Sequence, residues 1–405
     1  MSEIASLPCF AACNIEWACY FALMYACKPP VPQAFHGGRF FDAIGTDFHD
    51  LSRAECVISA DVLDAWFDPS PRVIERLREH LPFLMRTSPP VHGDGLISAI
   101  SEVRGVPPAN LCLGGGSSHL IFTCLPQLTS ENSRILILDP MYGEYSHVLE
   151  QVLHRTVCRH HLHEEESFQI NTALLFEHVR LLRPDVVVLV NPNSPTGQYW
   201  PRTEMLELLR RFPETLCIVD ETYVDYLFGN QSLEREVAHF RNLVVLKSMS
   251  KVYALSGLRV AYLAASEGMV RRVGRYLPPW SASLPAQVAA VEALHDPDYY
   301  QQRYRETHLL RCQALEVLAE LEGVQVFDSC ANFYLLKYTQ QSATWVQTKL
   351  EAENIFIRHC DSMSPRFNDN FLRIAVKAKE QNDRTVSALK RVSSLNLVPL
   401  ETFSG

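Results

Sequence analysis

The residues around one lysine are the first part of this 405-residue sequence whose types and spacing could carry chemistry. Ser248 and Ser250 precede Lys251, and Arg259 follows it by eight residues. Asp220 ends an earlier apolar run, and the ends of such strands bind ligands in open α/β sheets, although the position also suits a helix N-cap. Arg259 opens another apolar run, so we expect it to need an anionic partner.

A glycine turn supplies a complementary anion site. The turn Gly114–Gly116 precedes Ser117 and Ser118, which open a predicted helix, and free amides at a helix N-terminus bind anions. Alone, such a turn is common. Together with Lys251 and Asp220 it meets the needs of pyridoxal phosphate, which requires a lysine for a Schiff base, a carboxylate opposite the pyridine nitrogen and a phosphate cradle.

The elements that would bring these residues together follow an alternating pattern beyond residue 100. Short apolar runs separated by helical patterns are typical of a parallel sheet wound by right-handed crossovers. The expected strands are Asn110–Leu113, Ile135–Leu138, Val186–Val190, Leu216–Val219, Leu243–Leu246 and Val260–Leu263, with helices over Ser117–Leu128 and Tyr142–Leu153. A smaller α+β domain is expected to follow, with a long helix from about Pro285 through Ala319, strands Val324–Phe327, Phe333–Leu336 and Leu372–Val376, and a final helix Glu380–Val392.

Composition narrows the possible partners and compartments. The net charge of −9 leaves no basic footprint for nucleic acid, and twelve cysteines without a CxxC pair favour reduced thiols in the cytoplasm. The apolar stretch Cys9–Cys27 is interrupted by Asn14 and Glu16 and lacks a basic start, which favours a packed N-terminal arm over a membrane segment. The histidines of His160–His163 are expected in a solvated loop, and no metal site is predicted.

Three ordered motifs resemble one enzyme family, the fold-type I pyridoxal-phosphate enzymes of aminotransferase class I and II. They are the lysine signature Ser248–Ala261, the Asn-Pro-rich turn Asn191–Gly197 and the strand end Asp220–Tyr223. Within the family, the sequence looks most like the branch of histidinol-phosphate aminotransferases and threonine-phosphate decarboxylases. The supporting segments are His36–Gly38, Pro69–Ile74, Pro140–Tyr142, Pro279–Trp280 and Leu372–Val376, and the resemblance covers roughly residues 36–395.

The resemblance implies an α/β fold with a large domain, built on a mostly parallel sheet of the seven-stranded type, and a small α+β domain. The expected divisions are residues 1–50 for the N-terminal arm and part of the small domain, 51–285 for the large cofactor-binding domain and 286–405 for the small C-terminal domain. Subunits of this family share their sites, so the resemblance also implies a homodimer that acts on a small-molecule amino acid.

The resemblance further assigns roles to single residues. Lys251 would carry the internal aldimine and then act as general acid and base, Asp220 would pair with the pyridine nitrogen, and Tyr223 would donate to the phenolic oxygen. Arg373 would bind the substrate α-carboxylate, and Arg358 is either a second anionic contact or a surface arginine. Tyr142 would stack on the ring or belong to the core, and the phosphate would be held by Gly116, Ser117, Ser118, Ser248, Ser250 and Arg259.

The sequence departs from the family pattern at three places. Ser194 replaces the asparagine that binds the phenolic oxygen, so either its hydroxyl or Asn193 must serve. The stretch 85–89 replaces a Tyr-Pro that a partner subunit commonly supplies to the phosphate, and 57–66 replaces the usual short segment. Asp61 and Asp64 in this segment and Glu16 in the N-terminal arm are candidate contacts for a cationic substrate, or else caps and surface charges.

Several reactions remain compatible with these residues. Transamination through a Lys251 aldimine and a quinonoid is the first hypothesis. The second is β- or γ-elimination, replacement or ring closure, as in enzymes that cyclise arginine derivatives. The third is α-decarboxylation, suggested by the decarboxylase-like ending Ile374–Lys377. A scaffold that binds the cofactor without turnover is the remaining alternative.

Overall fold

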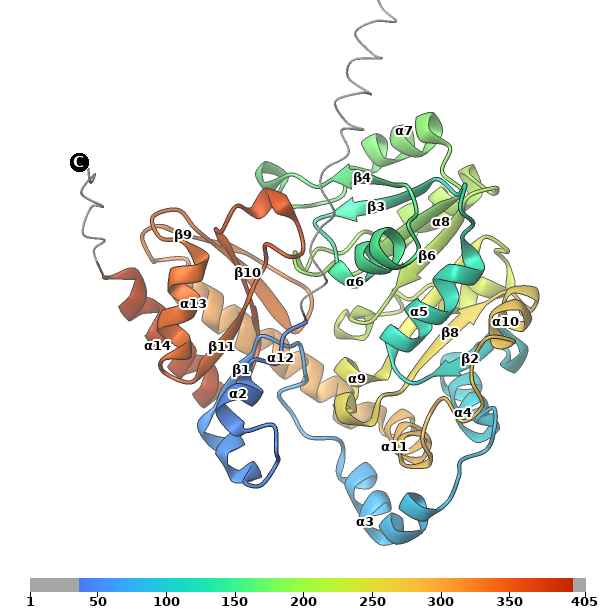
Figure 1. The fold of residues 1–405 in the computed structure, drawn as a ribbon, viewed down its shortest axis with the longest axis horizontal. Coiled ribbons are helices and arrows are strands. Elements are labelled where there is room, and N and C mark those ends of the chain that lie inside the picture. Colours follow the sequence, from blue (N-terminus) through green and yellow to red (C-terminus); the bar gives the residue numbers. More distant parts are fainter. Residues whose placement is uncertain (1–35, 396–405) are drawn as a thin grey trace, which may run out of the picture. The chain divides into compact units, whose positions relative to one another are not determined.

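The computed structural model describes residues 36–395, which belong to one structural unit and contain two β-sheets (Figure 1). The predicted N-terminal arm, including Glu16, lies outside the described residues. Among residues 36–395, no helix is long and apolar enough to cross a membrane.

The larger sheet has seven strands in the order β2-β8-β7-β6-β5-β3-β4. Its buried strands are largely apolar, as expected for strands covered on both faces, and the polar residues Asp139, Asp220 and Lys247 lie at or near their carboxyl ends. All strands run parallel except β8, which is antiparallel to β7 and β2. The strands are β2 (Leu111–Gly114), β3 (Ile135–Asp139), β4 (Val157–His161), β5 (Val186–Val190), β6 (Leu216–Asp220), β7 (Leu243–Ser248) and β8 (Ala261–Ala265).

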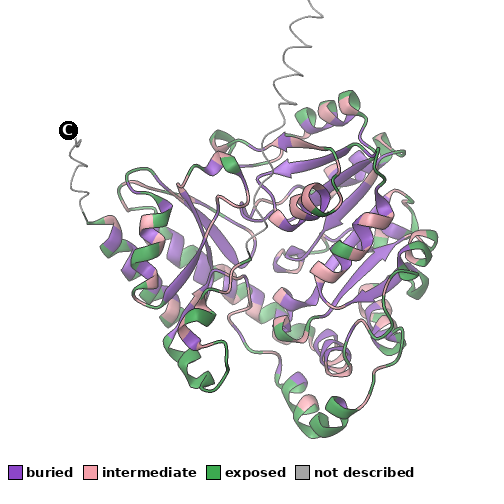
Figure 2. Ribbon diagram, in the orientation of Figure 1, coloured by how far each residue is buried: buried purple, intermediate pink, exposed green. Residues whose placement is uncertain are grey.

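Helices pack around this sheet, and one of them, α3, is largely exposed to solvent. Helix α5 contacts β2, β7 and β8, and α11 packs against both α3 and α4. Figure 2 shows that most of α3 is exposed to solvent. These helices are α3 (Pro71–Arg86), α4 (Asp94–Arg104), α5 (Ser117–Leu128), α6 (Gly143–Ser146), α7 (Thr172–Leu182), α8 (Arg202–Arg211), α9 (Met249–Val252), α10 (Glu267–Gly274) and α11 (Leu284–Leu294). Helix α2 (Phe40–Ile44) packs instead against Phe356 of the smaller sheet.

The smaller sheet has five strands in the order β1-β11-β12-β10-β9. Strand β1 (Ile58–Ala60) pairs in parallel with β11 (Ile355–His359), although it lies within the range predicted for the large domain; the domain boundaries themselves stay a prediction. The other strands are β9 (Val324–Phe327), β10 (Phe333–Tyr338) and β12 (Phe371–Ala375), accompanied by helices α12 (Pro297–Leu318), α13 (Ala343–Glu351) and α14 (Lys379–Ser393).

Two predicted helices differ from the structure. The long helix expected through Ala319 is two helices, because α11 ends at Leu294 and the Asp296–Pro297 pair starts α12 with proline in its first turn. The helix expected over Tyr142–Leu153 is the short α6 followed by a wider π-helical turn, His147–Val152.

The solvated loop predicted around the histidine tract is wrong. His160 and His161 lie on β4, the edge strand that pairs with β3. His160 is buried, with its Nδ1 atom 3.1 Å from Nδ1 of His178, and burial lowers its pKa to about 3. His161 Nδ1 lies 3.0 Å from a carboxylate oxygen of Asp139. The tract alternates across a strand, with one imidazole facing inward.

Candidate active site

The carboxyl ends of three parallel strands meet at the candidate site. Val190 of β5 pairs with Asp220 of β6, and Asp220 pairs with Leu246 of β7. Lys251 lies in α9, which directly follows β7. The structure therefore brings the predicted carboxylate and the predicted lysine to the same edge of the sheet, as expected for a ligand-binding α/β crevice.

Asp220 is a buried carboxylate whose two oxygens are both hydrogen-bonded. Oδ1 accepts from the Thr222 backbone N–H at 2.9 Å and from its hydroxyl at 2.6 Å, while Oδ2 accepts from Tyr145 OH at 2.9 Å. Burial raises the pKa of Asp220 despite these donors. A cationic group at this position would offset that cost, and a protonated pyridine nitrogen is such a group.

Lys251 faces the carboxylate of Asp64, which sequence reasoning considered as a contact for a cationic substrate or as a cap or surface charge. The Lys251 Nζ atom donates to Asp64 Oδ1 at 2.6 Å, and Asp64 lies in the loop after β1. The backbone carbonyl of Lys251 accepts from Tyr226 OH at 2.9 Å, which fixes α9 against the end of β6. The amine is thus held at the side of the crevice formed by residues 61–64.

The start of α5 fits a phosphate cradle. Gly116 adopts a φ of +95° at the N-cap, and a Cβ atom there would lie 2.5 Å from Nη2 of Arg259, so the guanidinium lies directly against this turn. Ser250 contributes a buried hydroxyl that has no hydrogen-bond partner within the described part of the chain. Ser248 Oγ accepts from the Ser250 N–H at 3.4 Å, as a helix N-cap. Free amides, a hydroxyl and a guanidinium are the donors that a phosphate requires.

Arg259 reaches this cradle for a different reason than the sequence suggested. We expected it to open a buried strand and to need an anion, but it lies before β8 with an exposed side chain and a left-handed φ of 56°. Its Nη1 donates to the Ser256 carbonyl at 3.2 Å. Water can solvate this exposed cation, so the argument from burial was wrong.

Of the two predicted aromatic contacts, Tyr223 follows β6 and Tyr142 lies between β3 and α6. Tyr223 is buried with its ring 5.3 Å from that of Phe333, and burial raises its pKa. Tyr142 donates its hydroxyl to Glu144 Oε2 at 2.7 Å, and its ring lies 6.3 Å from that of Tyr145. Their contacts with a cofactor ring and its phenolic oxygen stay predictions.

The hydrogen bonds of Ser194 and Asn193 separate two predicted alternatives. The amide nitrogen of Asn193 is engaged by the Pro140 carbonyl at 3.0 Å and by Thr196 Oγ1 at 3.0 Å. Its buried Oδ1 has no partner among residues 36–395, but this atom can only accept. Ser194 Oγ accepts from Arg373 Nη1 at 2.9 Å and keeps a proton to donate, which favours Ser194 as the donor to a phenolic oxygen.

Arg373 and Arg358 face each other across β12 and β11. They are directly paired in the antiparallel register, and both are buried, so Arg358 is not the surface arginine that the sequence left open. Arg373 Nη2 donates to the Asp61 carbonyl at 3.1 Å, whereas its buried Nε has no partner in the described range. Burial, with repulsion from Arg373, lowers the pKa of Arg358 to about 10. Like charges directly opposite are unfavourable in a sheet, so this pair suits an anionic ligand.

Asp61 is a structural cap. Its carboxylate accepts from the backbone N–H groups of Gly38 at 2.5 Å, Arg39 at 3.2 Å and Val62 at 3.0 Å. These bonds fix the loop after β1 and support the cap alternative for this residue. Sequence reasoning missed Tyr145 and Thr222 as hydrogen-bond donors to Asp220: Thr222 lies in the motif Asp220–Tyr223 but was given no role there, and Tyr145 is 75 residues away in sequence.

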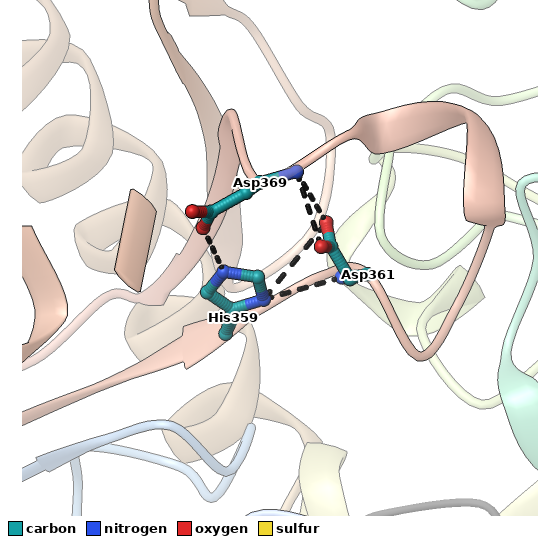
Figure 3. Close-up of side chains that lie close together, drawn as sticks. All are labelled: His359, Asp361 and Asp369. Atoms are coloured by element: carbon teal, nitrogen blue, oxygen red, sulfur yellow. Dashed lines mark hydrogen bonds and ion pairs between the residues drawn. The ribbon is translucent and has the colours of Figure 1, made fainter. Parts of the chain in front are cut away.

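A further cluster follows β11, where His359, Asp361 and Asp369 lie close together (Figure 3). Their own hydrogen bonds account for this arrangement: Asp369 Oδ1 lies 2.6 Å from His359 Nε2 and accepts from the Thr344 N–H at 2.8 Å. The Asp361 carboxylate accepts from the Asp369 N–H at 3.0 Å. The cluster closes the loop between β11 and β12.

Comparisons with known proteins identify the class of this fold and site. The family model of aminotransferase class I and II matches residues 62–389. Histidinol-phosphate aminotransferase 1 of Bradyrhizobium diazoefficiens is 30% identical over 331 residues, covering 80% of this chain and 90% of the relative. The histidinol-phosphate aminotransferase of Ruminiclostridium cellulolyticum is 28% identical over 328 residues, with 80% and 89% covered.

Solved structures agree with this fold. The pyridoxal-5'-phosphate complex of histidinol-phosphate aminotransferase from Sinorhizobium meliloti has a TM-score of 0.76 at 18% identity, covering 91% of this chain and 98% of its own. The L-threonine-O-3-phosphate decarboxylase of Porphyromonas gingivalis has a TM-score of 0.72 at 24% identity, with 83% and 99% covered.

The chain therefore has the fold of a type I pyridoxal-phosphate enzyme. It belongs to the aminotransferase class I and II family and is a pyridoxal-phosphate-dependent enzyme resembling histidinol-phosphate aminotransferases.

Proposed function

We propose that this enzyme transaminates a small amino compound that carries an anionic group, with Lys251 as the reacting amine and Asp220 opposite the pyridine nitrogen. The observation that supports this most strongly is that the buried Asp220 ends β6 while Lys251 follows the end of the neighbouring strand β7. Bound pyridoxal phosphate would supply an electron sink for the bond broken at the α-carbon.

The remaining roles follow from the donors at each part of the crevice. The amides of Gly116, Ser117 and Ser118, with the hydroxyls of Ser248 and Ser250 and the guanidinium of Arg259, would bind the cofactor phosphate. Tyr142 would cover the ring, while Tyr223 and Ser194 would donate to the phenolic oxygen. Asn193 would hold the turn in place through its bonds to Pro140 and Thr196.

The substrate would bind on the side of the smaller sheet. Arg373 presents an Nε that has no hydrogen-bond partner within residues 36–395, and the guanidinium of Arg358 lies across from it. A carboxylate or phosphate between the two would neutralise like charges that otherwise repel, and a guanidinium fork fixes its orientation. The curated relatives are named for histidinol phosphate, whose phosphate is an anion of this kind.

We also propose that two chains form a homodimer through the region of α3. Apolar side chains on this helix and near it are exposed, among them Leu81, Phe83, Met85, Val91 and Trp280. Figure 2 shows how little of α3 is covered. Light scattering should give twice the chain mass, and Phe83→Glu should shift it toward the monomer.

The reaction is tested by reconstituting the full chain with pyridoxal phosphate and adding single amino compounds. If the reaction is transamination, the amino compound alone should convert the cofactor to a stable pyridoxamine form. With a keto acid added as amino acceptor, the amino compound should be turned over continuously to its keto product. Release of carbon dioxide, or loss of a β- or γ-substituent with deuterium entering the product, would instead select decarboxylation or elimination and ring closure.

A further inference from the structure

Tyr145 is a fully buried residue outside the predicted motifs, and its hydroxyl reaches the candidate cofactor site. It lies in α6 and donates to Asp220 Oδ2 at 2.9 Å. The other carboxylate oxygen, Oδ1, already accepts two hydrogen bonds from Thr222, one from its backbone N–H and one from its hydroxyl. Tyr145 therefore binds the oxygen that Thr222 leaves free.

The position of Tyr145 depends on how the start of α6 is anchored. Helix α6 follows β3, and β5 separates β3 from β6 in the sheet, so the phenol reaches Asp220 across the end of β5. The Pro140 carbonyl, which precedes α6, accepts from Nδ2 of Asn193 in the turn after β5 at 3.0 Å. Within the helix, the Ser146 hydroxyl donates to the Gly143 carbonyl at 2.9 Å. These bonds fix the helix to the strand ends, so the phenol is held at one place relative to the carboxylate.

The groups around Asp220 act on its charge in opposite directions. Burial raises the pKa of this carboxyl, and the negative charge of Glu144 acts in the same direction. The hydrogen bonds from Thr222 and Tyr145 oppose this rise, because a donor stabilises the charged form of a carboxyl group. The ionised form of Asp220 therefore depends on its donors, and Tyr145 is one of them.

Two other phenols face this carboxylate, those of Tyr142 and Tyr223. Burial raises the pKa of each, and the negative charge of Asp220 adds to the rise, so both stay neutral. The Tyr142 hydroxyl donates to Glu144 Oε2 at 2.7 Å instead. Within the described part of the chain, Tyr145 is the phenol that is hydrogen-bonded to Asp220.

We propose that Tyr145 is a positioning residue that keeps Asp220 ionised and oriented toward the pyridine nitrogen, so that the shared proton stays on the ring. The inference rests on the proposed role of Asp220 and assigns a residue that acts through it. Without the phenol, the buried carboxylate would be more basic, and the proton between the two groups would move toward Asp220. A ring nitrogen without its proton is a weaker electron sink, so the loss would reach the reacting bond.

A second tyrosine provides a matched control, because it makes the same kind of bond elsewhere. Tyr262 on β8 is also buried, and its hydroxyl donates to the buried carboxylate of Glu234. Tyr145→Phe and Tyr262→Phe therefore remove the same group from the same kind of partner. Both should lower the free energy of unfolding, but only the first removes a donor to Asp220.

The test uses the full chain reconstituted with pyridoxal phosphate that carries ¹⁵N in its ring. The ¹⁵N chemical shift reports whether the ring nitrogen holds a proton. We expect the protonated value in the unmodified chain and in Tyr262→Phe, and a shift toward the neutral pyridine value in Tyr145→Phe. Tyr145→Phe should also raise the dissociation constant of the cofactor about tenfold, as for one lost hydrogen bond to a charged group, whereas Tyr262→Phe should leave it unchanged.

The outcomes separate this inference from the proposed function. If the ring nitrogen is unprotonated in the unmodified chain, the proposed role of Asp220 fails and the inference fails with it. If the nitrogen is protonated there and equally so in Tyr145→Phe, the inference is overturned and the proposed role of Asp220 stands. Equal changes in Tyr145→Phe and Tyr262→Phe would also overturn it, because a general loss of stability would then explain both.

A second measurement applies if Tyr145→Phe does not fold. Fluorotyrosine incorporated at position 145 keeps the phenol, and its fluorine resonance reports the hydrogen bond to Asp220. This resonance should move when pyridoxal phosphate binds, and it should move much less in Asp220→Asn. Equal movement in the two chains would overturn the inference.

Discussion

At the end of β6, both oxygens of Asp220 are hydrogen-bonded, whereas on β11 and β12 two buried guanidinium groups face each other and one Nε lacks a partner among residues 36–395. In the first region, a single cation would neutralise the buried carboxylate. In the second, an anion would neutralise the two guanidinium groups. This difference separates the expected cofactor side of the crevice from its expected substrate side.

The largest effect should come from the cofactor side. Asp220→Ala removes the carboxylate opposite the ring nitrogen, so we expect turnover to fall by roughly 10²–10³, the range typical of a lost group that stabilises charge in the transition state. Single-turnover rates with the reconstituted chain would measure this. Thr222→Val, which removes one donor to Asp220, should cost far less; an equal loss in both would mean that Asp220 acts only through folding.

The substrate side should respond through binding. Arg373→Lys keeps the charge but loses the fork, and we expect kcat/KM to fall by roughly 100-fold, equal to about 3 kcal/mol for a lost charge-assisted hydrogen bond. Arg358→Lys should cost less, because Arg358 Nη2 donates to Ser362 Oγ at 2.9 Å. Steady-state kinetics with one substrate compare the two, and a larger loss at Arg358 would reverse the assignment.

Ser194 connects the two sides, and its effect should be intermediate. Ser194→Ala leaves Arg373 Nη1 without its acceptor and removes the donor expected at the phenolic oxygen. We expect about a tenfold loss in kcat/KM and a changed pH dependence of the visible band. Ser194→Asn should restore both, because an amide can accept from Arg373 and still donate. A Ser194→Ala variant with an unchanged band would remove Ser194 from the cofactor site.

The sequence predicts the strands whose residues are continuously apolar, and it misses those whose apolar pattern is interrupted by polar residues. Val186–Val190 was predicted to the residue, because a strand covered on both faces is continuously apolar. Strands β4 and β11 were missed, since histidines and arginines interrupt their apolar patterns.

In the candidate site, residues that lie in sequence motifs could be predicted, whereas contacts between residues far apart in sequence could not. Lys251 and Asp220 lie in ordered motifs and were found. The contact of Tyr145 with Asp220 joins residues 75 positions apart, and the contact of Asp64 with Lys251 spans 187, so each depends on how the sheets bring distant loops together.

The last prediction concerns folding stability and not turnover, at a buried residue outside both regions. His160 is buried in its neutral form, and its pKa of about 3 lies below the ordinary value, so the unfolded chain binds the extra proton below about pH 6.5. Stability should therefore fall as the pH decreases, by about 2 kcal/mol at pH 5. Denaturant unfolding at pH 5 and 7.5 measures the difference in the free energy of unfolding. His160→Phe should reduce this difference. If the difference is as large in His160→Phe, His160 is not the group responsible.

The central claim is that Lys251 forms the covalent link to pyridoxal phosphate opposite Asp220. Borohydride reduction of the reconstituted chain, followed by peptide mass spectrometry, tests it directly. The account predicts one pyridoxyl group, on the peptide at Lys251, and none in Lys251→Ala. A modified Lys247 or Lys377 with Lys251 unmodified would contradict it.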